Sequence, residues 1–170
     1  VHTLDLSCRQ WPLESLQVLT SVLQEIADQV VILKIDDVIA GLVTEDGLAS
    51  LAFLANIFSS QPSDSSKSKS QIREIDLSDN ALGTRGAVEL APLLHLQTLQ
   101  RLYFVNCGLS AESFSDTLLP ILMMNAPNLT ALGLGRNQLG PVGAEHVGSL
   151  LKKCIKLESF SYAGSRPQVE

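Results

Sequence analysis

The strongest constraint on the fold of this chain is a six-residue pattern that recurs along its length. The pattern reads apolar-x-x-apolar-x-apolar, as in Ile72-Arg-Glu-Ile75-Asp-Leu77. The copies begin about 27 to 30 residues apart, except for a longer interval between the second and the third. A unit of this size cannot bury its apolar face alone, so successive units must stack into one continuous core. The six copies begin near residues 1, 30, 72, 99, 129 and 157.

A second recurring position follows each copy, three residues after its last apolar residue. We call it the ladder slot, because an Asn or Cys there can turn inward and bond to backbone groups of the neighbouring turn. The slot is occupied in chain order by Arg9, Val38, Asn80, Cys107, Asn137 and Ser165. The complete pattern is that of a leucine-rich repeat. It predicts an α/β solenoid, a horseshoe with parallel strands on its concave side and helices on its convex side.

The same pattern places the elements of a single domain of about six repeats over residues 1–170. The longer interval contains residues 59–70, whose serines, lysines and proline predict a flexible insertion. Pro120 should kink the fourth helix, because proline has no N–H to donate within a helix. No polar capping repeat is recognisable, so we expect the chain to be part of a longer array.

The pattern also predicts where the elements lie. Strands are expected near residues 3–6, 32–36, 74–77, 101–104, 131–134 and 159–162, and helices near 15–27, 45–58, 86–94, 112–123 and 144–153.

Composition excludes several classes of function. A net charge of −6 argues against nucleic acid as a partner, and no apolar run is long enough for membrane insertion. Three widely spaced cysteines argue against a disulfide framework or structural zinc and indicate reduced thiols, with Cys8 and Cys154 expected to be buried. The three histidines are scattered and no glycine-rich phosphate loop occurs, so neither a metal site nor a cofactor is predicted. We expect a monomer that is not itself an enzyme.

One row of residues carries a functional hypothesis. The residue before each ladder slot should project outward, because its neighbour turns inward, and adjacent strands lie ~4.8 Å apart. Such a polar row fits either ordinary solvated loop residues or a recognition surface for a protein partner. Tyr103, an outward residue of the fourth strand, is grouped with the row as a candidate partner contact. We call this the rim row: Cys8, Asp37, Asp79, Asn106, Arg136 and Gly164.

Five segments, spanning nearly the whole chain, carry loop motifs more specific than the general repeat. They are VVILKIDDVIAGLVTEDGLASL at 30–51, IREIDLSDNALGTRGAVELAPLL at 72–94, LQRLYFVNCGLSAE at 99–112, LGLGRNQL at 132–139 and SYAGSRPQVE at 161–170. In this order they resemble repeats of the Ran GTPase-activating proteins. The third segment resembles that family's N-N-G-L loop, with Asn106 at the first asparagine and Cys107 in place of the second.

The resemblance implies a function that the spacing alone does not. It implies a crescent that binds a Ran-type small GTPase in its GTP form and accelerates hydrolysis by ordering the GTPase's own catalytic glutamine, without an arginine finger. Asn106 would then assist catalysis, while Asp37, Asp79, Arg136 and Tyr103 would contact the partner. The resemblance also implies a protein of the cytoplasm or the nuclear envelope.

The chain departs from this family at one place. The family has a Gly-Arg pair followed by a further basic residue, whereas this chain reads Gly41-Leu42-Val43-Thr44. Both basic side chains are therefore missing. This departure keeps a second hypothesis open: a non-catalytic leucine-rich-repeat scaffold of the ribonuclease-inhibitor type, such as the sensor domain of a cytosolic receptor or a relative of actin-capping proteins.

Overall fold

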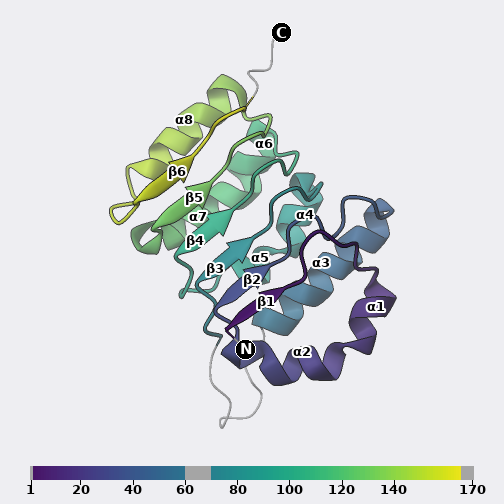
Figure 1. The fold of residues 1–170 in the computed structure, drawn as a ribbon. Coiled ribbons are helices and arrows are strands. Elements are labelled where there is room, and N and C mark those ends of the chain that lie inside the picture. The colour runs from purple at the N-terminus through teal and green to yellow at the C-terminus, as the bar shows by residue number, and fades with distance from the viewer. Residues whose placement is uncertain (1, 60–69, 166–170) are drawn as a thin grey trace.

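A computed structural model describes residues 2–59 and 70–165, and in it six short strands form one parallel sheet in chain order (Figure 1). The predicted strands are confirmed, and each ends one or two residues earlier than expected. Most of the predicted insertion at 59–70 lies outside the described residues. The strands are β1 (Thr3–Asp5), β2 (Ile32–Lys34), β3 (Glu74–Asp76), β4 (Arg101–Tyr103), β5 (Ala131–Gly133) and β6 (Ser159–Ser161).

Helices return the chain between strands and cover one face of the sheet, which gives the predicted leucine-rich-repeat solenoid (Figure 1). The second and fifth predicted helices are continuous, whereas the first, third and fourth are divided. None of the helices in the described part of the chain is long and apolar enough to cross a membrane. The helices are α1 (Leu13–Val18), α2 (Thr20–Ile26), η1 (Ala27–Gln29), α3 (Thr44–Ser59), α4 (Gly83–Glu89), α5 (Ala91–Leu94), α6 (Ala111–Ser113), η2 (Phe114–Leu118), α7 (Leu119–Asn125), η3 (Ala126–Asn128) and α8 (Gly140–Leu151).

Pro120 interrupts the fourth helix as predicted, and the interruption takes a specific form. Residues Phe114–Leu118 form a π-helical turn, and α7 begins at the residue before the proline. A π turn widens the hydrogen-bonding pattern, and such turns are, like proline, a recognised source of helix kinks.

The core lies between the sheet and the helices and is continuous through the repeats. The central residues of neighbouring strands are partners in register: Leu33, Ile75, Leu102 and Leu132 all lie at this level and are buried. The residues on either side of them in each strand point to the opposite, concave face. Burial of this apolar column is the main force that holds one repeat on the next.

Asn80 confirms the role predicted for the ladder slot. Its side chain is fully buried, and its Oδ1 accepts hydrogen bonds from the backbone N–H groups of Val38 (2.9 Å) and Ile39 (3.1 Å). Its Nδ2 donates to the carbonyl oxygens of Ile35 (2.7 Å) and Leu77 (2.9 Å). One amide therefore satisfies polar backbone groups of two repeats that the core would otherwise leave unpaired.

The next two ladder slots repeat this arrangement, one with an amide and one with a thiol. The buried Asn137 accepts from the backbone N–H of Cys107 at 3.0 Å and donates to the carbonyl of Phe104 at 2.7 Å. The Cys107 thiol donates to the carbonyl of Leu77 at 3.2 Å. Cys107 thus fills its slot as predicted, although a thiol is a weaker donor than an amide.

The three cysteines are free thiols, and their burial corrects one prediction. Cys107 and Cys154 are buried as expected, but Cys8 is exposed. The reason is its place in the rim row, where the backbone directs the side chain outward rather than into the core. Burial raises the pKa of the Cys107 thiol to about 12, and burial also raises the pKa of Cys154.

These environments predict strongly unequal reactivity toward a thiol reagent. Because the thiolate is the nucleophile, we expect iodoacetamide at pH 8 to modify Cys8 at least about tenfold faster than Cys107 in the folded protein. A peptide map by mass spectrometry over a time course measures this ratio, and labelling in urea provides the reference in which all three react. Equal rates without denaturant would contradict the burial of Cys107.

Candidate protein-binding surface at the strand ends

The rim row shares one backbone conformation that the sequence analysis did not predict. Its five non-glycine members have φ values between 51° and 58°, and Gly164 has a φ of 75°. This left-handed conformation costs a residue with a Cβ roughly 1–2 kcal/mol, less for Asn and Asp. It turns the chain so that the rim residue points outward. In the second to fifth repeats the ladder residue after it is buried, whereas Arg9, which follows Cys8, is exposed and corrects the prediction for that slot.

Backbone hydrogen bonds hold the rim row in place beyond the strands. The N–H of Asp79 donates to the carbonyl of Val105 at 2.8 Å, and the N–H of Asn106 donates to the carbonyl of Gly135 at 2.9 Å. Equivalent bonds from Asp37 and Arg136 continue the same parallel ladder. The rim side chains therefore project from a rigid frame, with one side chain for each repeat.

Three of the predicted site residues meet in this row. The Nδ2 of Asn106 donates to the Oδ1 of Asp79 at 2.7 Å, and the Nη2 of Arg136 lies 3.8 Å from the same oxygen. Asn106 is exposed, and the side chains of Arg136 and Asp79 are 61% and 47% exposed. The carboxylate of Asp79 thus joins an amide and a guanidinium contributed by the next two repeats.

Asp37 and Tyr103 are not part of this cluster. The side chain of Asp37 lies in the rim row one repeat before Asp79 and makes no hydrogen bond or ion pair with other described residues. Tyr103 lies on the concave face, where its ring covers Gly133: a Cβ added at that glycine would lie 3.0 Å from the Cδ1 of Tyr103. Burial and the nearby charge of Glu74 raise the pKa of the Tyr103 hydroxyl.

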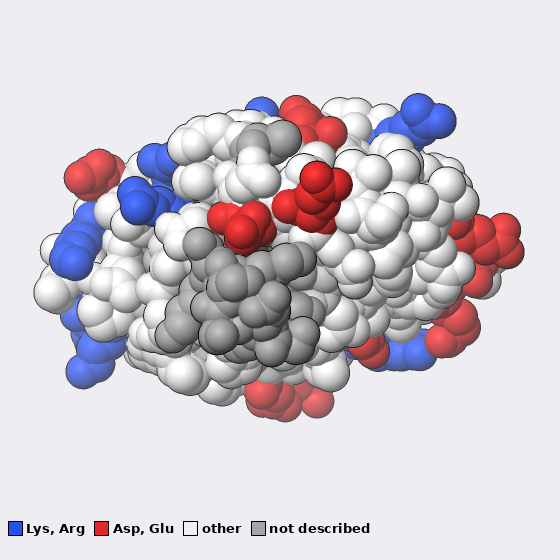
Figure 2. Space-filling model, turned by 90° about the horizontal axis from the view of Figure 1, so that it is seen from below, with Lys and Arg blue, Asp and Glu red and all other residues white. Residues whose placement is uncertain are grey.

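The concave face beside the rim row is acidic over the first three repeats. Partial burial, followed by the charges of Asp76 and Asp5, raises the pKa of the Asp36 carboxyl. Lys34 lies 3.9 Å from Asp5 and offsets part of this charge. Seen from below, Lys and Arg side chains gather at the end of the molecule that carries α8 and β6 (Figure 2). This separation of acidic and basic side chains along the solenoid favours a partner whose basic patch faces the first three repeats.

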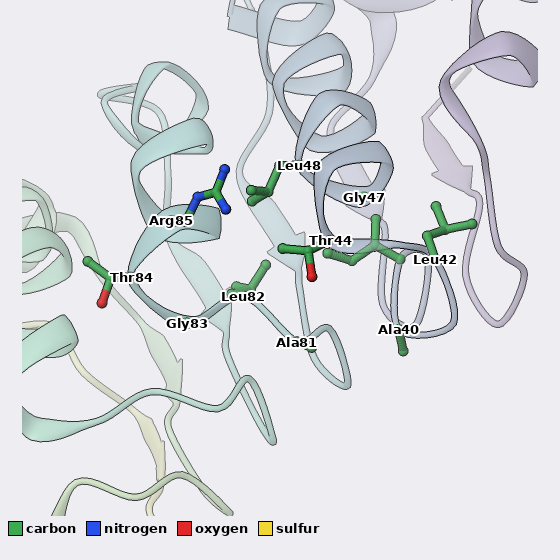
Figure 3. Close-up of a pocket in the computed structure, with 11 residues that line it drawn as sticks. Ala40, Leu42, Thr44, Gly47, Leu48, Ala81, Leu82, Gly83, Thr84 and Arg85 are labelled. Atoms are coloured by element: carbon green, nitrogen blue, oxygen red, sulfur yellow. The ribbon is translucent and has the colours of Figure 1, made fainter.

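The residues that replace the missing basic pair lie near the start of α3. Leu42 and Thr44 line an apolar cavity of about 310 Å³ between the N-terminal ends of α3 and α4 (Figure 3). Arg85 also lines it, and its guanidinium forms a bidentate ion pair with Glu45 at 2.8 and 2.9 Å. The region therefore presents an apolar surface beside an internally paired arginine.

Comparison with known proteins agrees with this architecture. A family model described as Leucine Rich repeat matches residues 70–91 and 125–147. The fold is a leucine-rich-repeat solenoid. The chain is similar to NACHT, LRR and PYD domains-containing protein 3 of Rattus norvegicus and of Mus musculus, with 39% identity to each over 80 residues. Those residues are 46% of this chain and 8% of each relative.

The arrangement is suited to recognition by surface polar groups. Among residues 2–59 and 70–165, no group of three or more His, Cys, Asp or Glu side chains could hold a metal ion. Asp79, Asn106 and Arg136 together offer one carboxylate, one amide and one guanidinium at the surface. These groups can make directional hydrogen bonds to a docked protein.

Proposed function

We propose that this leucine-rich-repeat domain binds a Ran-type small GTPase in its GTP form and accelerates the GTPase's own hydrolysis of GTP. The observation that carries the proposal is the exposed amide of Asn106 in the rim row, next to the buried Cys107. Cys107 holds the ladder, so Asn106 is available to a partner. The resemblance of residues 99–112 to the N-N-G-L loop of the Ran activators supports the same role. We place this activity in the cytoplasm.

The chemistry of GTP hydrolysis suits such an amide. Phosphoryl transfer depends on positioning the attacking water and stabilising spreading charge, and it needs no covalent contribution from an activator. An amide that holds the GTPase's catalytic glutamine in its productive orientation would lower the entropy cost of that step. Asp37, Asp79, Arg136 and Tyr103 would then contact the docked GTPase.

A second candidate function is a non-catalytic scaffold that binds a protein without affecting its chemistry. Two observations favour it: the similarity to NACHT, LRR and PYD domains-containing protein 3, and the apolar cavity at Leu42 and Thr44. In this case the rim row and the concave face would provide affinity alone.

A single-turnover assay separates the two candidates. We expect the 170-residue chain to raise the rate of GTP hydrolysis by Ran loaded with GTP, and to bind the GTP form more tightly than the GDP form. A Ras-type GTPase at the same concentration is the specificity control. Because the acidic concave face should steer a basic partner, we also expect the association rate to fall as salt is raised.

The outcomes are distinct. Binding to the GTP form without faster hydrolysis would overturn the activator function and leave a scaffold for the same GTPase. Absence of binding to either nucleotide form would overturn Ran as the partner and leave the second candidate.

A further inference from the structure

We infer that Asp79 is a positioning residue: its carboxylate orients the Asn106 amide so that the amide oxygen faces the partner. This inference rests on the proposed function, because it assigns Asp79 a role in the catalytic assistance that Asn106 would give. It goes beyond docking, since it attributes to Asp79 an effect on the rate of hydrolysis and not only on affinity.

The hydrogen bond between the two residues determines the orientation of the amide. A carboxylate only accepts hydrogen bonds, so the group that faces Asp79 at 2.7 Å must be the NH₂ of Asn106. The oxygen and the nitrogen of a primary amide lie on opposite arms of one planar carbon. Fixing the nitrogen toward Asp79 therefore directs Oδ1 of Asn106 away from it.

The frame around this bond makes the orientation rigid. Both residues have the left-handed backbone conformation, and both are anchored by backbone hydrogen bonds to the following repeat, Asp79 to Val105 and Asn106 to Gly135. Arg136 reaches back across one repeat to the same carboxylate oxygen, at 3.8 Å. Because this ion pair is exposed, its contribution is small, and it favours the carboxylate position that accepts from the amide.

The orientation specifies what the partner must offer. An outward amide oxygen selects a hydrogen-bond donor, such as the NH₂ of a glutamine side chain, and rejects an oxygen that carries negative charge. Without Asp79, the amide could rotate and present either end. The role of Asp79 is therefore to exclude the unproductive orientation before the GTPase docks.

The first test removes the acceptor without straining the backbone. In Asp79→Gly, glycine accepts the φ of 57° at position 79, and we expect the stimulated rate at saturating GTPase to fall about tenfold while affinity changes less than threefold. Asp79→Asn keeps an acceptor oxygen, and we expect it to restore most of the rate. Asp116→Asn, an exposed residue of η2 on the helical side, is the matched control for loss of one negative charge and should behave as the wild type.

The second test asks whether Asp79 acts through Asn106. In an Asn106→Gly background, Asp79→Gly should produce no further loss of stimulated rate, because the group that it positions is gone. An equal tenfold loss in both backgrounds, or a loss of affinity with no loss of saturated rate, would overturn the inference and leave Asp79 as a docking residue.

A spectroscopic readout separates this inference from the proposed function. The side-chain amide resonances of Asn106, identified by their disappearance in Asn106→Gly, should move toward the positions of a solvated asparagine in Asp79→Gly and stay in place in Asp116→Asn. This measurement uses the free chain. A shift in a chain that activates no GTPase would refute the proposed function while confirming the orientation, and an unchanged resonance would refute the orientation itself.

Discussion

Asn106→Gly is expected to lower the stimulated rate of GTP hydrolysis about 100-fold at saturating GTPase, which is the effect of removing one preorganised polar group from a transition state. The amide contributes through position rather than bond making, so its loss should reduce the rate of the chemical step. Affinity for the GTP form should change little, because the other rim residues remain. Single-turnover hydrolysis and equilibrium binding, measured on the same preparation, separate these two effects.

The choice of glycine follows from the backbone at this position. Asn106 has a φ of 56°, so alanine would add strain of roughly 1 kcal/mol to the folded state, whereas glycine would not. We therefore expect Asn106→Gly to keep the melting temperature near that of the wild type, within a few degrees. Full stimulated turnover in this variant would remove Asn106 from the mechanism.

The strands and the ladder-slot residues could be predicted because burial restricts which residue types these positions accept. The central strand residue of each repeat, such as Leu33, Ile75 or Leu102, must face the core. A shift of the strand register by one residue would turn these side chains to the solvent face. The ladder slot is equally constrained, because Asn80 must satisfy backbone groups that are cut off from water. Because every repeat must meet the same two requirements, apolar residues in the strand and a hydrogen-bonding residue in the ladder slot, the pattern recurs and can be recognised in a single sequence.

The conformation and contacts of the rim row could not be predicted in the same way. The left-handed backbone can be recognised where Asn or Asp occupies it, but Cys8 and Arg136 adopt it despite its cost, because the neighbouring turns impose it. The sequence therefore predicts a buried Cys8, because nothing at a cysteine indicates the left-handed backbone that directs its side chain outward. The bond between Asp79 and Asn106 depends on side-chain directions at a solvated surface, where burial gives the sequence no periodic signal.

The contrast between ladder and rim explains how one repeat can serve two purposes. The two positions are adjacent in the chain, yet the left-handed residue sends one side chain outward and the next inward. Substitutions at the ladder should therefore change stability, and substitutions at the rim should change recognition. Because each repeat contacts only its neighbours, a loss at one ladder position weakens the stacking of two repeats at once.

Asn80→Ala is expected to lower the free energy of unfolding by about 3–5 kcal/mol. Alanine leaves the N–H groups of Val38 and Ile39 and the carbonyl of Ile35 without their partner, and each unsatisfied buried group costs roughly 1–3 kcal/mol before the site relaxes. The carbonyl of Leu77 keeps only the weaker donor, the Cys107 thiol. This is a large share of the ~5–15 kcal/mol that stabilises a typical domain. Urea unfolding followed by circular dichroism measures the change.

Asn106→Ala is the matched control, because it makes the same substitution at an exposed position and should cost only the roughly 1 kcal/mol of backbone strain. The difference between the two variants isolates the buried hydrogen bonds from the loss of an asparagine as such. Hydrogen exchange gives the local signature: the amides of Val38 and Ile39 should lose protection in Asn80→Ala and keep it in Asn106→Ala. Equal destabilisation by the two substitutions would mean that the ladder bonds of Asn80 do not hold the second and third repeats together.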